Sequence, residues 1–479
     1  MILKQSKEVK FANQIQLMRS RHLLFTFLTV PLLYCLAIYN AGCAQIGSPT
    51  GGPRDTIPPK LVSASPKINS TNVTGNKITL TFNEYIDLKD IQSNVLISPY
   101  PKKTPAIDFK LRTVTVKLKD SLLPNTTYSI NFGNAIIDNN EGNPFKEFTY
   151  VFSTGKNLDT LILTGKVLIA ETGKADSTLM AMLYRNADDS AVQKRKPDYI
   201  TKLSGDGSFY FKNLPAGNFK VYALKDGDGG KTYNSKKELF AFNDAAITLS
   251  EKPETVLLYA SAVEKESRPV TTTKPAGADK KLRLVLPIMP VQDLLSPFRL
   301  SFNKPLKKFD PLKIILTDTN YKAIPSTAWS IDSSRTKIML TSKWQEDMQY
   351  RLILDSAAVS DSSDKSIART DTLRLVTKKE TDYGNVVLRF SNIDLTKHPV
   401  LQFIQGEELK ESYPLTALEW RKKLMPPGEY EIRILYDDNN NGKWDTGDYS
   451  KKLQPEKAIT LSQKLAVKAN WDNERDIKL

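Results

Sequence analysis

Oxygen-bearing side chains near the C-terminus have the spacing of a loop that binds a metal ion. They occupy positions 1, 3, 5, 9 and 12 of residues 437–448, at Asp437, Asn439, Asn441, Asp445 and Asp448. Gly442 stands at position 6, where such a loop bends sharply, and the carbonyl group of Lys443 is at position 7. Ca²⁺ is a hard cation that takes six to eight oxygen ligands at about 2.4 Å. The sequence therefore predicts that these residues bind calcium.

This segment resembles the calcium loop of EF-hand proteins, which has the same ligand positions and the same glycine. Two features depart from that family: Asp448 stands where the last ligand is a glutamate, and the flanking segments have the pattern of β-strands. The alternative interpretation is a polar hairpin whose Asn and Asp side chains hydrogen-bond to their own backbone. The related segment 226–234 has Gly230 at position 5, so we predict a turn there, although it keeps Asp226, Asp228 and Asn234.

Residues suited to catalysis are scarce. His398 is the only histidine after residue 42, and the two cysteines are Cys35 and Cys43. A Ser-His-Asp arrangement would need His398, which stands between predicted strands as a turn residue, and zinc sites of His and Cys are excluded. Two carboxylates could still meet across a glycosidic bond, but the sequence marks no such pair. We therefore predict a protein that is not an enzyme and has no cofactor other than calcium.

The N-terminal region has the layout of a secretory signal. Residues 23–39 are apolar apart from two threonines and are interrupted by Pro31, and they follow Arg19 and Arg21. The run is shorter than the roughly 20 residues of a comfortable membrane span. Small residues then precede Cys43. This arrangement predicts a signal helix within residues 1–42 that a peptidase removes.

The residues around Cys43 resemble a bacterial lipoprotein lipobox, in which the cysteine is diacylated on sulfur and becomes the new N-terminus. Asn40 departs from the family, which usually has leucine there. The resemblance implies that the protein is lipid-anchored at Cys43 to the outer membrane, on its periplasmic or its surface face, with residues 43–55 as a tether. The alternatives are a signal peptide cut elsewhere and an uncleaved anchor.

Charge does not indicate a nucleic-acid partner. The formal charge of +15 falls to +11 without residues 1–42, because five Lys or Arg and one Glu are removed. The remaining basic residues are scattered among acids along alternating segments, and no basic cluster interleaves with aromatic residues as a binding groove requires. These basic residues are expected to lie on the solvated surface of β-sheets. Binding of the protein to anionic lipids or acidic glycans is a remaining alternative.

Short runs that alternate apolar and polar residues begin at Leu61. They include residues 77–83, 94–98, 112–118, 127–132 and 148–153. A period of two is typical of strands with one buried face. Residues 56–157 resemble the bacterial Ig-like domain described from S-layer proteins, through segments 58–66, 78–86, 123–128 and 150–155. In that type of sandwich Tyr128 would be a corner tyrosine whose hydroxyl group bonds to nearby backbone.

The next segment predicts a different sandwich. Within residues 158–262, tight turns are predicted at 206–207 and 215–217. A Gly-x-Phe segment, the Pro-x-Gly turn and a final apolar strand follow one another there. This pattern resembles the prealbumin-like or carboxypeptidase-regulatory-like sandwich. Residues 263–281 have almost no large apolar side chain and are predicted to be a linker.

The pair of sandwiches then recurs. Residues 298–306, 350–354 and 372–377 repeat the pattern of the first domain, and residues 424–435 repeat that of the second. We expect a second Ig-like sandwich at 282–378 and a second prealbumin-like one at 379–479. The predicted fold is therefore all-β, with duplicated tandem sandwiches after the signal helix. The whole arrangement resembles Ig-like domain lipoproteins of Bacteroidota.

The signal segment, Cys43 and the tandem sandwiches together predict an envelope lipoprotein that acts as a spacer, adaptor or binding module for envelope proteins or glycans. The alternative is a surface protein that binds or, less readily, processes glycans. A row of exposed aromatic side chains on one sandwich face would favour that alternative, and the candidates are Trp329, Trp344, Trp420, Trp444 and Trp471.

Overall fold

The computed structural model describes residues 54–250, 254–264, 281–285, 291–325 and 328–479. The predicted signal helix, Cys43 and most of the predicted linker lie outside these residues. The chain divides into two compact units, Met1–Pro58 with Asn140–Asn143, and Pro59–Asn139 with Pro144–Leu479. In the first unit, the Arg54 guanidinium donates to the Glu141 carbonyl group and the Asn143 amide to the Asp55 carbonyl group, both at 3.0 Å.

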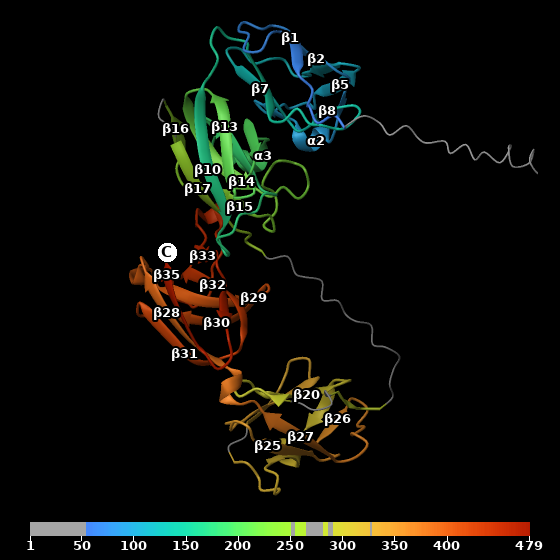
Figure 1. Cartoon of the computed structure of the whole chain (residues 1–479), viewed down its shortest axis with the longest axis vertical. Helices are drawn as coiled ribbons and strands as arrows, with labels where there is room; N and C mark the ends of the chain where they lie inside the picture. Colours follow the sequence, from blue (N-terminus) through green and yellow to red (C-terminus); the bar gives the residue numbers. More distant parts are fainter. Residues whose placement is uncertain (1–53, 251–253, 265–280, 286–290, 326–327) are drawn as a thin grey trace, which may run out of the picture. The chain divides into compact units, whose positions relative to one another are not determined.

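The second unit consists almost entirely of paired β-strands (Figure 1), which confirms the predicted all-β architecture. Among its described residues the two α-helices, α2 (Ile91–Asn94) and α3 (Ala191–Lys194), are single turns. No helix in the described part of the chain has the length and apolar character to cross a bilayer. Four sets of sheets follow one another along the sequence, and we name them domains 1 to 4.

Domain 1 (β1–β9) is an antiparallel sandwich whose strands pair in the orders β1-β2-β6-β5, β4-β7-β9 and β3-β8. In β2 the alternating Ile78, Leu80 and Phe82 are buried in the core, while the residues between them are more exposed. The strands are β1 Leu61–Ser65, β2 Lys77–Phe82, β3 Ile86–Leu88, β4 Leu96–Ser98, β5 Ala106–Lys110, β6 Thr113–Lys117, β7 Thr127–Gly133, β8 Ile136–Asp138 and β9 Phe148–Ser153.

Tyr128 makes the contact expected of a corner tyrosine, because its hydroxyl oxygen accepts a hydrogen bond of 2.8 Å from the Leu123 amide. Tyr350 does the same for the Gln345 amide in domain 3, at 3.2 Å. Burial raises the pKa of the Tyr128 hydroxyl. The bond pins the turn before β7 to the strand that follows.

Tyr128→Phe is expected to lower the free energy of unfolding of domain 1 by about 1 kcal/mol, because the half-buried Leu123 amide loses its acceptor. The urea midpoint of the variant measures this loss. Tyr85→Phe is the matched control, since Tyr85 is 51% exposed. Equal midpoints for Tyr128→Phe and Tyr85→Phe would contradict the corner role.

Domain 2 (β10–β17) has a three-stranded sheet, β13-β10-β17, and a larger one in the order β12-β11-β14-β15, with β16 paired to β14. Strand β17 runs parallel to β10, whereas the other pairs are antiparallel. The strands are β10 Leu161–Ile169, β11 Met180–Arg185, β12 Tyr199–Lys202, β13 Ser208–Leu214, β14 Gly217–Leu224, β15 Phe240–Phe242, β16 Ile247–Leu249 and β17 Glu254–Ala260.

Domain 3 (β18–β27) repeats the sheet orders of domain 1, with β18-β20-β24-β23, β19-β27-β25-β22 and β21-β26, and adds one strand, β19, which pairs parallel to β27. Its buried core contains Leu300, Ile338, Leu352 and Leu354, each without exposed surface. The elements are β18 Leu284–Val285, β19 Val291–Gln292, β20 Phe298–Phe302, β21 Leu306–Phe309, η1 Pro311–Lys313, β22 Ile314–Thr317, β23 Ala328–Ile331, β24 Lys337–Thr341, β25 Gln349–Leu354, β26 Val359–Asp361 and β27 Asp371–Thr377.

Domain 4 (β28–β35) repeats domain 2, with sheets β31-β28-β35 and β30-β29-β32-β33, and β34 paired to β32. Strand β35 is parallel to β28, as β17 is to β10. The elements are η2 Glu380–Asp382, β28 Gly384–Ser391, η3 Leu395–Lys397, β29 Pro399–Gln405, β30 Glu408–Pro414, β31 Glu419–Met425, β32 Gly428–Tyr436, η4 Tyr449–Lys451, β33 Ala458–Thr460, β34 Leu465–Val467 and β35 Asp472–Lys478.

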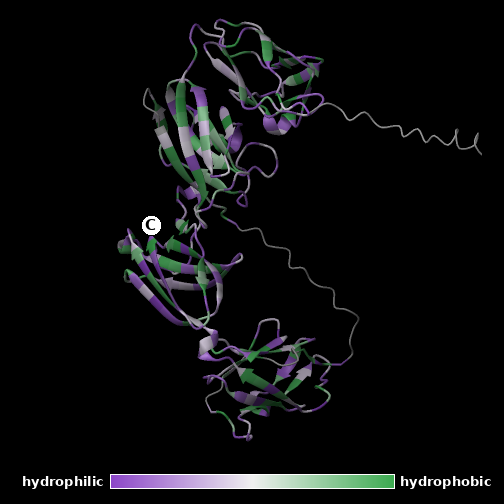
Figure 2. Cartoon of the chain, in the orientation of Figure 1, coloured by the Kyte–Doolittle hydropathy of each residue, from purple (hydrophilic) through white to green (hydrophobic). Residues whose placement is uncertain are grey.

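Bands of hydrophobic and hydrophilic residues follow one another along many strands (Figure 2), and apolar residues such as Ile78, Leu80 and Phe82 in β2 are the buried ones. Domain 2 departs from this pattern, because β14 and β15 bury residues on both faces. One face belongs to the core between the sheets, and the other belongs to a separate apolar cluster that includes Tyr184, Tyr222 and Phe240. Two acidic loops follow the equivalent strands β14 and β32, and they contain the candidate site residues.

Candidate metal sites in two acidic loops

The two loops occupy equivalent places in domains 2 and 4. Leu224 pairs with Phe240 across β14 and β15, and Leu435 pairs with Ala458 across β32 and β33. Asp226 lies two residues after Leu224 and Asp437 two residues after Leu435, and a glutamate precedes β15 and β33 by two residues. The two loops therefore present carboxylates at corresponding edges of the two corresponding sheets.

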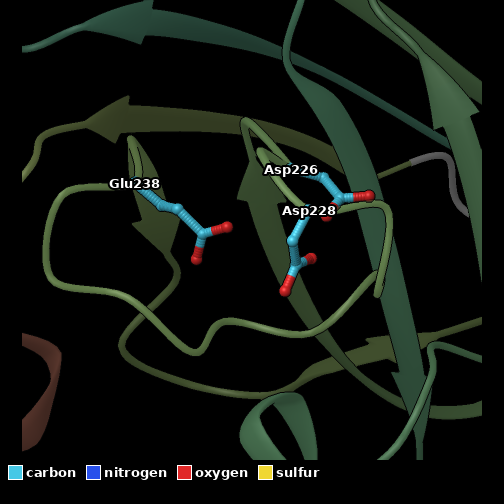
Figure 3. Close-up of side chains that lie close together, drawn as sticks. All are labelled: Asp226, Asp228 and Glu238. Atoms are coloured by element: carbon cyan, nitrogen blue, oxygen red, sulfur yellow. The ribbon is translucent and has the colours of Figure 1, made fainter.

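In domain 2 three carboxylates converge: one oxygen each of Asp226, Asp228 and Glu238 lies within 4.8 Å of the others. In Figure 3 the Glu238 side chain lies opposite the neighbouring side chains of Asp226 and Asp228. The Asp226 side chain has no exposed surface and forms an ion pair with Lys231. The ammonium group of Lys231 thus supplies positive charge at the place where the carboxylates meet.

Backbone amides hold this cluster in place. Asp226 accepts from the Gly229 amide at 3.0 Å and Asp228 from the Gly230 amide at 2.7 Å. Asp228 also accepts from the Asn234 side-chain amide at 2.6 Å, and this bond is the main reason that the pKa of Asp228 is lowered. We predicted a turn here, and the structure adds a converging acidic cluster whose third member, Glu238, the sequence reading missed.

In domain 4 the predicted calcium loop is folded around Asp437, which is completely buried. Its two carboxylate oxygens accept from the amides of Asn441 at 3.1 Å and Gly442 at 2.6 Å. Gly442 has a φ of +76°, a conformation that glycine adopts readily and that the sharp bend needs. The Asn439 side-chain oxygen also accepts from the Asn441 amide, at 3.1 Å.

Asp445 and Glu456 complete this second loop. The Asp445 carboxylate accepts from the side-chain amides of Asn439 and Asn441, the latter at 2.6 Å. Glu456 accepts from the amides of Asp438 and Asp445, both at 2.9 Å. Burial raises the pKa of Glu456, and the negative charges of Asp437 and Asp445 raise it further. Three acidic groups thus repel one another in a poorly solvated place.

The structure groups the predicted ligands differently from an EF-hand. Asp437, Asn439, Asn441 and Asp445 lie together, with the Asn441 side-chain oxygen accepting from the Lys443 amide at 2.7 Å. Asp448 instead caps η4, since its carboxylate accepts from the amide and the hydroxyl group of Ser450. These bonds lower the pKa of Asp448. Glu456, which precedes the returning strand, takes the position that the sequence assigned to Asp448.

A cleft with a volume of about 920 Å³ adjoins both loops. Asp228 and Glu238 line it from the first loop, and Trp444 from the second. Arg433 also lines it, and its Nε atom has no hydrogen-bond partner among the described residues. Burial lowers the pKa of Arg433. Two of the three clustered carboxylates, those of Asp228 and Glu238, thus border the cleft.

The other candidate residues do not assemble with these loops. His398 is exposed at the end of η3 with a φ of +45°, which is typical of a turn residue. Four tryptophans are half-buried, and Trp471 is 62% exposed. Among the described tyrosines and tryptophans, the most exposed are Tyr85, Tyr210, Tyr321 and Trp471, one in each domain. They form no row on a single sandwich face, so the feature that would favour glycan binding is not found there.

The strand order and a family comparison define the class of domain 1. Residues 55–154, about a fifth of the chain, match the family described as "Bacterial Ig-like domain". Domain 1 is thus a bacterial Ig-like domain, and the protein is a tandem array of β-sandwiches that contains it. No curated protein matches the chain.

Several solved structures are similar to parts of the chain. The N-terminal part of the bacterial S-layer protein SbsC is 18% identical, over 44% of this chain and 45% of that one, with a TM-score of 0.16. The Bacillus anthracis TIE protein is 10% identical over 89% of this chain and 75% of that one, at 0.17. The major pilin BcpA of Bacillus cereus is 9% identical over 67% and 99%, at 0.16. Because these TM-scores are far below 0.5, the matches carry no argument about function.

Proposed function

We propose that the protein is a non-enzymatic lipoprotein of the bacterial cell envelope, anchored to the outer membrane through Cys43. Its tandem β-sandwiches would act as a spacer or adaptor that presents binding surfaces to envelope proteins or glycans. The observation that supports this proposal most is that a lipobox-like cysteine and a folded β-sandwich occur close together in the sequence. A cysteine follows an apolar leader and small residues, and the folded sandwiches begin 18 positions later, at Leu61.

The tether length fits this role. Arg54 already contacts the Glu141 carbonyl group, so eleven residues, 43–53, lie between the proposed anchor and the first contact. Eleven residues span at most about 40 Å when fully extended, so domain 1 would be confined near the bilayer surface. Repeating the sandwich pair lengthens the chain without adding a new kind of core, which is what a spacer requires. The match of domain 1 to bacterial Ig-like domains supports an envelope role.

The anchor can be distinguished from charge attraction by extraction. The protein is strongly basic, and attraction of Lys and Arg to anionic lipids is screened by salt, whereas acyl chains in a bilayer are not. Membranes that contain the full-length protein should retain it in 1 M NaCl and release it in detergent. Release by salt alone would contradict the lipid anchor.

We also propose that the loop around Asp437 binds calcium. The observation that favours this is the grouping of the buried Asp437 with Asp445 and Glu456, in which Glu456 accepts from the amides of Asp438 and Asp445. Burial and these acidic neighbours raise the pKa of Glu456. Because the folded pKa of this acid lies above its unfolded value, ionisation of Glu456 costs stability as the pH rises through that range. A divalent cation between the carboxylates would remove this cost. The oxygen donors would come from Asp437, Asn439, Asn441, Asp445 and Glu456.

Added calcium is expected to raise the melting temperature of the wild-type protein. A free concentration ten times the dissociation constant corresponds to about 1.4 kcal/mol of stabilisation. Asp437→Asn removes one buried charge at similar size and should abolish the calcium-induced shift. Asp438→Asn removes an exposed charge from the same loop and should leave the shift unchanged. A calcium-induced shift in Asp437→Asn equal to that of the wild type would refute the site.

A further inference from the structure

Domains 2 and 4 share a sheet order but differ in the length of the acidic loop. Three residues separate Asn234 from Glu238, whereas ten separate Asp445 from Glu456. The longer segment, residues 446–455, contains η4 (Tyr449–Lys451). We call this segment the arm. The residues on either side of it are equivalent in the two domains, so the arm is an insertion specific to domain 4.

One sheet face differs in a complementary way. The pair Tyr222 and Phe242 in domain 2 corresponds to the pair Arg433 and Thr460 in domain 4. Domain 4 thus has a polar outer face, while in domain 2 Tyr222, Phe240 and Phe242 form an aromatic one. All three are at most 5% exposed. Strands that are buried on both faces need a second covering layer.

The arm supplies part of that layer through Tyr449. This side chain is 7% exposed although it lies on a loop of domain 4. Its ring lies 5.0 Å from that of Phe242, 5.2 Å from Phe240 and 5.8 Å from Tyr222, measured between centroids. Its hydroxyl group donates to the Asp189 carbonyl oxygen at 2.7 Å and is 2.9 Å from the Tyr222 hydroxyl group. Both the apolar and the polar parts of the tyrosine are therefore satisfied by domain 2.

Polar contacts extend along the whole arm. Near its start, the Thr446 hydroxyl group donates to the Ala262 carbonyl oxygen at 2.8 Å, and the Gly447 amide donates to Ser261 at 3.2 Å. Near its end, the Gln454 amide donates to the Phe242 carbonyl oxygen at 3.1 Å. Lys452 forms an ion pair with Asp189 at 2.9 Å, and its ammonium group lies 4.2 Å from the Tyr449 ring centroid.

Strand β33 continues the contact beyond the arm. The Ala458 amide donates to the Ala170 carbonyl oxygen at 2.9 Å, and the Thr460 hydroxyl group donates to the Thr172 carbonyl oxygen. Gly173 lies beside this strand, and a β-carbon at Gly173 would overlap the Ala458 carbonyl oxygen. The turn after β10 therefore fits closely against β33.

We infer that the arm is an intramolecular docking element whose partner is the aromatic outer face of domain 2. It joins domains 2 and 4 independently of the peptide chain between them. Domain 3 and residues 263–281 lie between these domains in the sequence, so the docked arm closes a chain loop that contains domain 3. None of the contacts described above involves Cys43 or a proposed calcium ligand.

A nicked form of the full chain tests this inference. A protease site inserted within residues 265–280 allows one cleavage, after which domains 1 and 2 are on one piece and domains 3 and 4 on the other. The pieces of the wild-type protein should remain together in size-exclusion chromatography at micromolar concentration. Tyr449→Ala should weaken their association at least about 30-fold, as expected for a buried aromatic anchor. Tyr449→Phe keeps the ring and should give an intermediate loss.

Tyr321→Ala is the matched control, because Tyr321 is 59% exposed in domain 3 and should leave the association unchanged. Separation of the wild-type pieces at 10 µM would overturn the inference. An unchanged dissociation constant for Tyr449→Ala would also overturn it.

A second pair of variants changes the opposite side of the contact. Gly173→Ala places a methyl group against β33 and should weaken the association, whereas Gly406→Ala should not. The two glycines have nearly the same φ, +66° and +65°, but no atom lies within 4 Å of the position of a β-carbon at Gly406. Backbone strain is thus matched and only the contact differs. Equal association constants for the two variants would contradict docking at this edge.

Discussion

Cys43→Ala is expected to move nearly all of the protein from the membrane fraction to the soluble envelope fraction. Two or three acyl chains, each contributing about 0.8 kcal/mol per buried methylene group, hold a protein at a bilayer for practical purposes permanently. Without the Cys43 thiol no acyl chain can be attached. Only the salt-sensitive attraction of basic residues to anionic lipids would then hold the protein at the membrane. Fractionation followed by immunoblotting measures the change.

Cys35→Ala is the control for this experiment. Cys35 lies inside the apolar leader and would be removed with it, so the variant should fractionate like the wild type. If Cys43→Ala stayed in the membrane fraction and resisted salt, the anchor would have to be something other than a lipid on this sulfur, and the proposed function would fail.

Gly165→Ala is expected to destabilise domain 2 by about 3 kcal/mol. Gly165 lies in β10 between β13 and the parallel strand β17, and its β-carbon would lie 2.5 Å from the Val256 carbonyl oxygen and overlap the Phe209 ring. Phe209 is 3% exposed and Val256 belongs to the β10–β17 ladder, so neither can move without loss of packing or hydrogen bonds. Overpacking at rigid sites has costs of this size.

Urea unfolding, together with hydrogen exchange of the β10 and β17 amides, measures the effect of Gly165→Ala. Gly205→Ala in the same domain is the control, because no atom lies within 4 Å of the added methyl group. Its midpoint should match that of the wild type. Equal midpoints for Gly165→Ala and Gly205→Ala would show that the close approach of β10 and β17 is not fixed.

Strand alternation made the fold predictable. Residues 77–83 were predicted as a strand with one buried face, and β2 has these bounds to within one residue. The corner role of Tyr128 also followed from a Pro-Asn turn before an alternating run, and the structure confirms its bond to Leu123. Both are local patterns, in which the period of two directly determines which side chains are buried.

The grouping of the acidic residues was less predictable. Motif spacing identified Asp437, Asn439, Asn441 and Asp445, but it assigned Asp448 to a place that Glu456 occupies. Glu238 and Glu456 reach their loops because the chain returns as the next strand, and spacing within one loop contains no information about that return. A usable signal exists in the repeat itself, since each glutamate precedes its strand by two residues.

The docking of the arm could be anticipated only in part. The unusual length of the loop before Glu456 is visible in the sequence, as is the continuous apolar run of β14. Neither feature indicates that the loop packs against β14, because Tyr449 and Tyr222 are 227 residues apart and meet only through tertiary packing. Sequence periodicity identifies which faces are apolar, whereas the pairing of faces depends on shape.

Intact mass spectrometry of the mature protein tests the central claim most directly. The account predicts a chain that begins at Cys43 and carries the added mass of two or three acyl chains on that residue. A mature chain that retains the leader, or one that begins elsewhere with an unmodified N-terminus, would contradict it.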